Sequence, residues 1–331
     1  NEKNKWHGVN FGGWLLLEPG PSYPLFKNFG NPKDEYSLMT KTHPDNHKMC
    51  GAKALAEHRA THTSLDDFMK AKEYGFNCVR LPFGYWVITG PTEGDPYVGP
   101  DLQYIDKALD WAAEAGIYVI LDLHGCPGGQ SNEHPCGRAK RGWKWEDWRL
   151  DETLQVIDKF CKRYAGNPQV VGVEVTNEPG DEIPAERLVQ FYEDATRVVR
   201  KHMPPHEVAV LWPIYYTYRL EEIATHCNAR EVWLSHDNIA LDMHYYHCFG
   251  GFGKLSHEGH LRACRRHGTA LQNLPGAVVG EWSLSKPGRA SEDQIKEWGE
   301  VQVRQYGKSS HGAFFWNWKD FPNSPEWDLR Q

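Results

Sequence analysis

The chain has 331 residues, of which 40% are hydrophobic and 24% charged, a composition typical of a globular protein and not of a disordered one. Its net charge of −7 at pH 7 argues against a nucleic-acid partner, because binding phosphates requires a concentrated basic surface. No apolar run approaches the roughly 18–20 residues of a membrane-spanning helix, so no transmembrane segment is expected. The most basic segment, residues 262–268, is interpreted as a solvated helix face.

Short β-branched or aromatic runs recur along the chain, and each is followed by a longer amphipathic stretch. They predict eight strands, at residues 7–14, 77–83, 117–125, 170–178, 207–213, 239–246, 277–283 and 312–318. No linker, charge block or low-complexity segment divides the chain. We therefore expect residues 1–331 to form one catalytic domain.

Helical patterns lie between most of the predicted strands. Ser64 can cap a helix that Gly75 ends, and residues 101–116 place apolar side chains on one face before Gly116. Further helices are predicted at residues 150–166, 184–203 and 291–307. Apolar strands alternating with helices indicate a parallel sheet covered by helices. Eight such strands favour an α/β fold of the closed (β/α)₈ barrel type over a doubly wound sheet. No glycine-rich nucleotide motif follows the first strand.

Polar, ionisable or indole side chains lie at the ends of six predicted strands. They are Arg80, His124, Asn177 with Glu178, His244 with Tyr246, Glu281, and Trp316. A single glutamate at a strand end is usually solvated or salt-bridged. In a barrel, however, the carboxyl ends of the strands converge on the face where active sites are built. The set as a whole therefore predicts a catalytic site.

Two glutamates facing each other across a barrel mouth suit the hydrolysis of glycosidic bonds. One carboxyl group protonates the leaving oxygen, and the other attacks the sugar or activates water. Glu178 and Glu281, on the fourth and seventh strands, are expected roughly 5–5.5 Å apart, as in retaining enzymes. Asn177 can bond the sugar 2-hydroxyl. Arg80 would keep a neighbouring glutamate ionised, while the other glutamate must hold a raised pKa.

Several segments of the chain carry a resemblance to a known family. They include "GVNFGGWLLLEP", "GFNCVRLPFGYW", "DLHGCPGGQS", "TNEP", "DMHYYHCF", "VVGEWS", "FFWNWK" and "PEW", in this order. The chain resembles glycoside hydrolase family 5 over nearly its whole length. Within that family it is most similar to the fungal exo-β-1,3-glucanases.

The resemblance implies roles for the candidate residues. Glu178 would be the acid/base and Glu281 the nucleophile of a retaining glycosidase that needs no cofactor. The residues that would line the sugar subsite are Arg80, His124, Asn177, His244, Tyr246 and Trp316. Tyr246 would bond the nucleophile and Trp316 would form the sugar platform. Glu18 matches a residue that binds the terminal glucose, and Phe249 matches an aromatic residue at the outer entrance.

The resemblance leaves the substrate open. A long insertion that follows "GEWS" in the exo-glucanases is absent here, which lowers one wall of the pocket and puts strict exo cleavage in question. The chain also ends with "PEWDLRQ", before the closing segment expected after the eighth strand. The alternatives are an endo-acting β-1,3-, 1,6- or 1,4-glucanase, or a β-glucosidase acting on a glycolipid or aryl glucoside. Two further alternatives are transglycosylation and a catalytically inactive carbohydrate-binding barrel.

The expected partner is a β-glucan or β-glucoside, bound by a monomer in an extracellular or cell-wall location. Cys126 and Cys136 flank a loop and are the best disulfide candidates, with free thiols as the alternative. Trp143, Trp145 and Trp148 belong either to local packing or to a clamp for the leaving sugar.

A metal site is not expected. His43 and His47, and His244 and His247, have suggestive spacing, but residues three apart at a strand end point to opposite faces.

Overall fold

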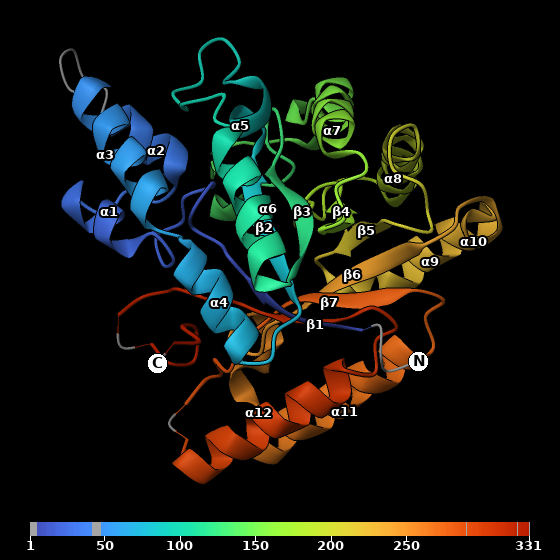
Figure 1. Ribbon diagram of the computed structural model, residues 1–331. Coiled ribbons are helices and arrows are strands. Elements are labelled where there is room, and N and C mark those ends of the chain that lie inside the picture. The colour runs from blue at the N-terminus through green and yellow to red at the C-terminus, as the bar shows by residue number, and fades with distance from the viewer. Residues whose placement is uncertain (1–4, 42–47, 289, 323, 331) are drawn as a thin grey trace.

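The computed structural model describes residues 5–41, 48–288, 290–322 and 324–330; His43 and His47 lie outside these ranges. Eight parallel strands close into a barrel in the order of the sequence, which confirms the predicted (β/α)₈ architecture (Figure 1). The strands are β1 (Trp6–Asn10), β2 (Cys78–Gly84), β3 (Tyr118–Gly125), β4 (Val170–Glu174), β5 (Ala209–Ile214), β6 (Ile239–Tyr245), β7 (Ala277–Trp282) and β8 (Gly312–Phe315). Pairing of β1 with β8, in the register Gly8 to Phe314, closes the barrel.

Helices cover the outside of the barrel. They are α1 (Tyr23–Asn28), α2 (Glu35–Lys41), α3 (Lys48–Thr61), α4 (Leu65–Glu73), α5 (Tyr85–Thr89), α6 (Gln103–Ala115), α7 (Leu150–Tyr164), α8 (Ala185–Arg200), α9 (Leu220–Ala229), α10 (Val232–Ser235), α11 (His257–Gln272) and α12 (Glu292–Tyr306). Short 3₁₀ turns are η2 (His134–Cys136), η3 (Trp145–Asp147), η4 (Thr217–Arg219) and η5 (Gly250–Lys254). No helix in these parts of the chain is long and apolar enough to cross a membrane.

The helix ends follow the signals in the sequence. Ser64 precedes α4, and both its backbone N–H and its hydroxyl donate to the Asp67 carboxylate. Gly116 ends α6 in the left-handed conformation, with φ of 64°. The sequence did not predict α1, α2 and α3, which form a separate group beside the barrel in Figure 1. Their core is a small apolar cluster of Leu17, Phe26, Leu38, Met39 and Leu55.

The interior of the barrel is layered along its axis. Its floor is an apolar cluster of Trp6, Cys78, Ile120, Ala209, Leu211, Ala240, Val278 and Phe314. Side chains two residues apart on a strand point to the same side. The layer above the floor therefore holds Arg80, Asp122 and Asp242, all fully buried. The sequence placed Arg80 at the end of a strand, but it lies in the middle of β2, one layer below the mouth.

The fourth strand ends earlier than predicted. We expected it to run to Glu178, but β4 ends at Glu174 and the chain leaves the sheet before the glutamate. Glu178 has a φ of 40°, which is uncommon for a residue other than glycine. The first strand likewise ends at Asn10, short of the predicted Trp14. In both cases the apolar run continues into a buried loop, so hydrophobicity alone overestimates strand length.

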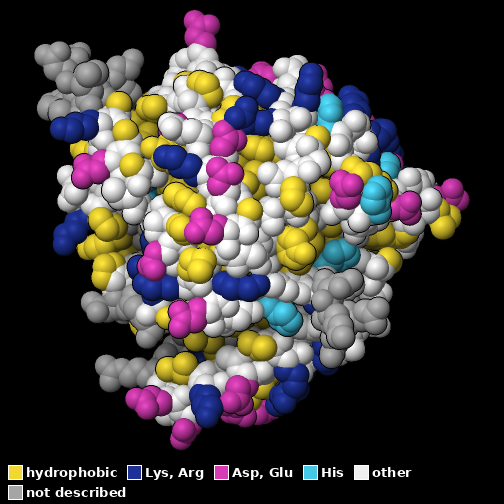
Figure 2. Space-filling model, in the orientation of Figure 1, with side chains coloured by type: hydrophobic (Ala, Val, Ile, Leu, Met, Phe, Trp, Pro, Cys, Tyr) yellow, Lys and Arg dark blue, Asp and Glu magenta, His cyan; other side chains and the backbone are white. Residues whose placement is uncertain are grey.

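Charged side chains of both signs are interspersed on the face of the molecule shown in Figure 2. The basic segment at residues 262–268 lies in α11, where Arg262, Arg265 and Arg266 are exposed. Arg262 and Arg265 each lie within 4 Å of the Glu258 carboxylate on the same helix. This segment is the solvated helix face that the sequence predicted.

The close pairing of β1 and β8 generates a stability prediction. A methyl group on Gly8 would overlap the Phe314 ring in the apolar floor. Gly8→Ala should therefore lower the free energy of unfolding by about 1–3 kcal/mol, measured by urea denaturation. In a Phe314→Leu background, Gly8→Ala should lower the free energy of unfolding by less, because the leucine side chain is shorter than the phenylalanine ring. Gly253→Ala is the control, because nothing lies within 4 Å of the added methyl group. Equal effects at Gly8 and Gly253 would contradict this packing.

Candidate active site

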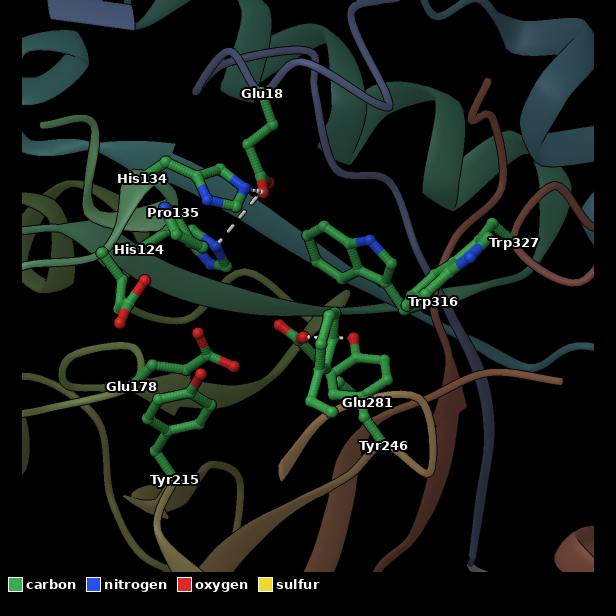
Figure 3. Close-up of a pocket in the computed structure, with 12 residues that line it drawn as sticks. Glu18, His124, His134, Pro135, Glu178, Tyr215, Tyr246, Glu281, Trp316 and Trp327 are labelled. Carbon is green, nitrogen blue, oxygen red and sulfur yellow. Dashed lines mark hydrogen bonds and ion pairs between the residues drawn. The ribbon is translucent and has the colours of Figure 1, made fainter. Parts of the chain in front are cut away.

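A cavity of about 330 Å³ opens at the carboxyl ends of the strands (Figure 3). Its lining residues are Glu18, His124, Glu133, His134, Pro135, Glu178, Tyr215, Tyr246, Phe249, Glu281, Trp316 and Trp327. Seven of the ten residues that the sequence singled out are among them. The other three, Arg80, Asn177 and His244, are buried and contact the two glutamates or each other. The structure thus brings the whole predicted set together.

Glu178 and Glu281 face each other across this cavity. Glu281 is the fifth residue of β7, whereas Glu178 follows β4 in a loop. One carboxylate oxygen from each glutamate and one ring nitrogen of His244 all lie within 4.8 Å of one another. This separation is close to the spacing of retaining glycosidases and shorter than the roughly 6.5–9.5 Å of inverting ones.

The two carboxyl groups have different partners. Arg80 Nη1 donates to Glu281 Oε1 at 2.9 Å, and the Tyr246 hydroxyl donates to Glu281 Oε2 at 2.6 Å. Both contacts favour an ionised carboxylate, which can only accept. Among the described residues, Glu178 has one side-chain contact of this kind, with His244 Nδ1 at 2.8 Å from Oε1. The other oxygen of Glu178 has no such contact with these residues.

Arg80 links these groups from below. It is fully buried, and two of its nitrogens form a bidentate pair with Glu174 at 2.6 and 2.9 Å. Its remaining partners are Asn10 and Asn177, each at 2.9 Å, Asp122 at 3.1 Å, and Glu281 at 2.9 Å. A guanidinium offers five donors in a rigid plane, so these contacts fix the relative positions of five strands and loops.

Arg80 is flanked by two Asp-x-His pairs, Asp122 with His124 and Asp242 with His244. The two histidines differ in charge. His124 Nδ1 contacts Asp122 at 2.6 Å, and Asn177 Nδ2 lies 3.2 Å from His124 Nε2. Burial, and then the Arg80 charge, lower the pKa of His124 to about 3. Burial would also lower the pKa of His244, but the charge of Glu281 and side-chain contacts with Asp242 and Glu178 raise it well above its usual value. His124 is therefore neutral and His244 is an imidazolium.

Burial also makes the acidic groups retain protons. It raises the pKa of Asp122 to about 7, although the Arg80 charge opposes the rise. It raises the pKa of Glu281 to about 8, against the opposing charges of His244 and Arg80. The nearby Glu178 carboxylate adds to that rise. Two close carboxyl groups titrate as a pair, and burial favours the retention of one proton by this pair.

The far end of the cavity is polar on one side and aromatic on the other. Glu18 is buried, and its Oε1 has no hydrogen-bond partner within the described part of the chain. Glu18 oxygens lie 3.9 Å from His124 Nε2 and 3.6 Å from His134 Nε2. The Trp316 ring stacks on His124 at a centroid distance of 5.7 Å. Together they provide an acceptor for hydroxyl groups and a flat apolar surface.

Five lining residues were missed by the sequence analysis: Glu133, His134, Pro135, Tyr215 and Trp327. Tyr215 directly follows β5, so the same argument from strand ends could have found it. Trp327 lies in the "PEW" segment, whose position relative to the cavity only the tertiary structure supplies. Trp143 and Trp148 are buried and donate to Gly129 O and Thr153 Oγ1 outside the cavity, as in the local-packing alternative.

The predicted disulfide is wrong. Cys126 and Cys136 are both free thiols. Cys126 Sγ lies 3.2 Å from Thr176 Oγ1, and Cys136 Sγ lies 3.0 Å from the Glu133 carbonyl oxygen. Each sulfur has its own polar partners in a buried loop.

Within the described ranges, two groups offer ligand-type atoms close together: Glu174, Asp242 and His244, and Glu178, His244 and Glu281. A cation in either group would compete with the positive charges of Arg80 and His244. His247 does not join them, because its Nδ1 lies 3.0 Å from His260 Nδ1 in a separate aromatic cluster. This placement agrees with the expectation that His244 and His247 point to opposite faces.

Comparisons with known proteins agree with this geometry. The family described as "Cellulase (glycosyl hydrolase family 5)" matches residues 44–322. The chain is 29% identical to a glucan 1,3-beta-glucosidase of Pichia angusta, over 99% of this chain and 84% of that protein. It is 34% identical to a probable glucan 1,3-beta-glucosidase A of Emericella nidulans, over 84% of this chain and 67% of that protein.

Solved structures share the fold at lower sequence identity. The rutinosidase of Aspergillus niger has a TM-score of 0.80 and 19% identity, over 99% of this chain and 93% of that one. The endoglucanase Cel5A of Pseudomonas stutzeri, in complex with cellobiose, has a TM-score of 0.61 and 16% identity, over 98% and 86% of the two chains.

Proposed function

Because the chain belongs to glycosyl hydrolase family 5, we propose that it is a retaining exo-acting β-glucosidase of β-glucans, with β-1,3 linkages preferred. Glu281 is the nucleophile and Glu178 the acid/base. The observation that carries the proposal is the spacing of the two carboxyl groups, since one oxygen of each lies within 4.8 Å of the other. The curated relatives named glucan 1,3-beta-glucosidase support the choice of substrate.

The first step forms a covalent intermediate. The Glu281 carboxylate attacks the anomeric carbon while Glu178 donates its proton to the departing glycosidic oxygen. Arg80 and Tyr246 hold the attacking group in place by the hydrogen bonds described above. In the second step Glu178 takes a proton from water, the water oxygen attacks the anomeric carbon, and the bond to Glu281 breaks. Both substitutions invert the carbon, so the β-configuration is retained.

Other residues orient the sugar. Asn177 Oδ1 accepts from Arg80, which fixes its amide so that Nδ2 can donate to the sugar 2-hydroxyl. The unpartnered oxygen of Glu18 accepts from hydroxyl groups at the end of the cavity. Trp316 provides the platform under the ring, and Phe249, which is 59% exposed, borders the entrance. A pocket closed by Glu18 and His134 suits a terminal glucose, and therefore exo action.

A second candidate is endo cleavage. The short segment after β7 leaves a hollow lined by Leu284, Ser285, Lys286, Gly288, Ala290, Ile295, Pro325 and Glu326. Glu326 O accepts from Leu284 N at 3.0 Å, and Glu326 is next to the cavity residue Trp327. A groove lowered at this point favours a longer glucan lying across the site. The extracellular location and the monomeric state remain predictions.

Product analysis tests the substrate and the mode of cleavage. The purified protein is incubated with laminarin, pustulan, cellulose oligomers, a glucosylceramide and an aryl β-glucoside, and early products are resolved by chromatography. We expect glucose as the first product, released fastest from laminarin. Mixed oligosaccharides would instead favour the endo alternative. Cleavage of the glycolipid or the aryl glucoside alone would reject a glucan substrate.

Substitution of each glutamate tests its role. Glu281→Gln should lower kcat by roughly 10⁴- to 10⁶-fold, because an amide cannot form the glycosyl-enzyme. Glu178→Ala should be partly rescued by azide on an activated aryl glucoside, where the small anion replaces water. Glu114→Gln, an exposed change on α6, is the control, and thermal unfolding verifies that the variants fold. Near-normal turnover by Glu281→Gln would disprove the assignment.

The shared proton predicts a bell-shaped pH profile. Because burial raises the pKa of Glu281 to about 8, the carboxyl pair loses its last proton near that pH, and kcat/KM should fall above it for want of an acid. At acid pH a second proton removes the nucleophile, and kcat/KM should fall again. The measurement uses a disaccharide, whose leaving group needs protonation. A profile that stays flat on the basic side would rule out the shared proton.

A further inference from the structure

Three tyrosines form a row that leads from the cavity to the surface. Tyr215 directly follows β5 and lines the cavity, Tyr216 is next to it, and Tyr218 lies in η4. Ring centroids are 4.5 Å apart between Tyr215 and Tyr216, and 5.6 Å apart between Tyr216 and Tyr218. Exposure rises along the row to 70% at Tyr218.

The row begins beside the acid/base and not beside the nucleophile. Figure 3 shows Tyr215 next to Glu178, whereas Tyr246 and Trp316 lie toward Glu281. The charge of Glu178 is the main reason why the pKa of the Tyr215 hydroxyl is raised, which reflects the same proximity. A leaving group protonated by Glu178 would therefore lie close to Tyr215. The row therefore starts where the leaving group emerges.

The row is fixed to the loop that carries Glu178. Arg219 is buried, and its Nη2 donates to Ile183 O at 2.8 Å. The Tyr218 hydroxyl donates to Asp181 Oδ2 at 2.6 Å. Ile183 and Asp181 both follow Glu178 in the segment between β4 and α8. These two contacts tie the tyrosine row to the segment that follows Glu178.

The surroundings of the row select a neutral ligand. The hollow beside it is lined by Asp181, Glu182, Ile183, Pro184, Tyr218, Arg219 and Glu222. Burial, and then the charges of Asp181, Glu133 and Glu182, raise the pKa of Tyr216. Such a surface repels anionic groups, while its carboxylates can accept from hydroxyl groups. The negative faces of the rings attract the weakly positive C–H groups of a pyranose.

We propose that this row forms subsites for the neutral sugars of the leaving group. Tyr215 and Tyr216 contact the first unit beyond the cleaved bond, and Tyr218 contacts the second. The enzyme accordingly prefers substrates with at least two units on that side, and the same surface receives a sugar acceptor in transglycosylation. This inference rests on the proposed function, because it needs Glu178 to mark the leaving-group side.

The test compares substrates that differ only in the leaving group. They are β-glucosyl fluoride, which has no leaving sugar, and a disaccharide and trisaccharide of the linkage that the wild type cleaves fastest. Tyr218→Ala should lower the trisaccharide-to-disaccharide ratio of kcat/KM by about five- to tenfold. Tyr216→Ala should lower the disaccharide-to-fluoride ratio by a similar factor. Tyr218→Phe keeps the ring and should restore most of the trisaccharide preference.

Tyr118→Ala is the matched control. Tyr118 is 46% exposed at the amino end of β3, on the face of the barrel opposite the cavity, so both ratios should equal those of the wild type. Wild-type ratios in Tyr218→Ala and Tyr216→Ala, with their thermal unfolding unchanged, would overturn the inference. If the wild type cleaves neither the fluoride nor the oligosaccharides, the proposed function itself fails.

Discussion

The buried guanidinium of Arg80 is the interaction on which the rest of the site depends. Removing a charge from water costs several kcal/mol, and only well-placed opposite charges offset that cost. Here Asp122, Glu174 and Glu281 surround the guanidinium at 2.6–3.1 Å. Those carboxyl groups come from β3, β4 and β7, so a single side chain on β2 couples distant parts of the barrel. The position of the proposed nucleophile is a consequence of that coupling.

The layering of the barrel explains the unusual protonation of the site. The apolar floor excludes water from below, and each acidic group above it is desolvated. Desolvation raises the pKa of Asp122 and Glu281, while a histidine in the same layer becomes neutral or charged according to its neighbours. Proton retention by the glutamate pair, which the proposed chemistry requires, thus follows from burial and the mutual proximity of the carboxyl groups.

The cavity is asymmetric, and the asymmetry follows from which loops border it. The side of Glu18 and Trp316 has a buried acceptor and a stacked indole, which suit one sugar held tightly. The side of Glu178 has the tyrosine row, which runs from the half-buried Tyr215 to the exposed Tyr218 and is tied to the segment after Glu178. Under the proposed function this row suits the departing sugars. Under the proposed function, the barrel mouth combines a closed site for one sugar with a path for the departing leaving group.

The sequence by itself determined the barrel and the strand-end residues at its mouth, because both depend on local periodicity. Strand runs spaced by helices indicate a closed parallel sheet, and the alternation of side chains along each strand orders the layers. Only the tertiary structure decided the details of geometry. It placed Glu178 beyond the end of β4 with a left-handed φ, left Cys126 and Cys136 as free thiols, and brought Tyr215 and Trp327 to the cavity. The distance between groups on strands that are not neighbours depends on barrel closure and on charges such as that of Arg80, which no local pattern encodes.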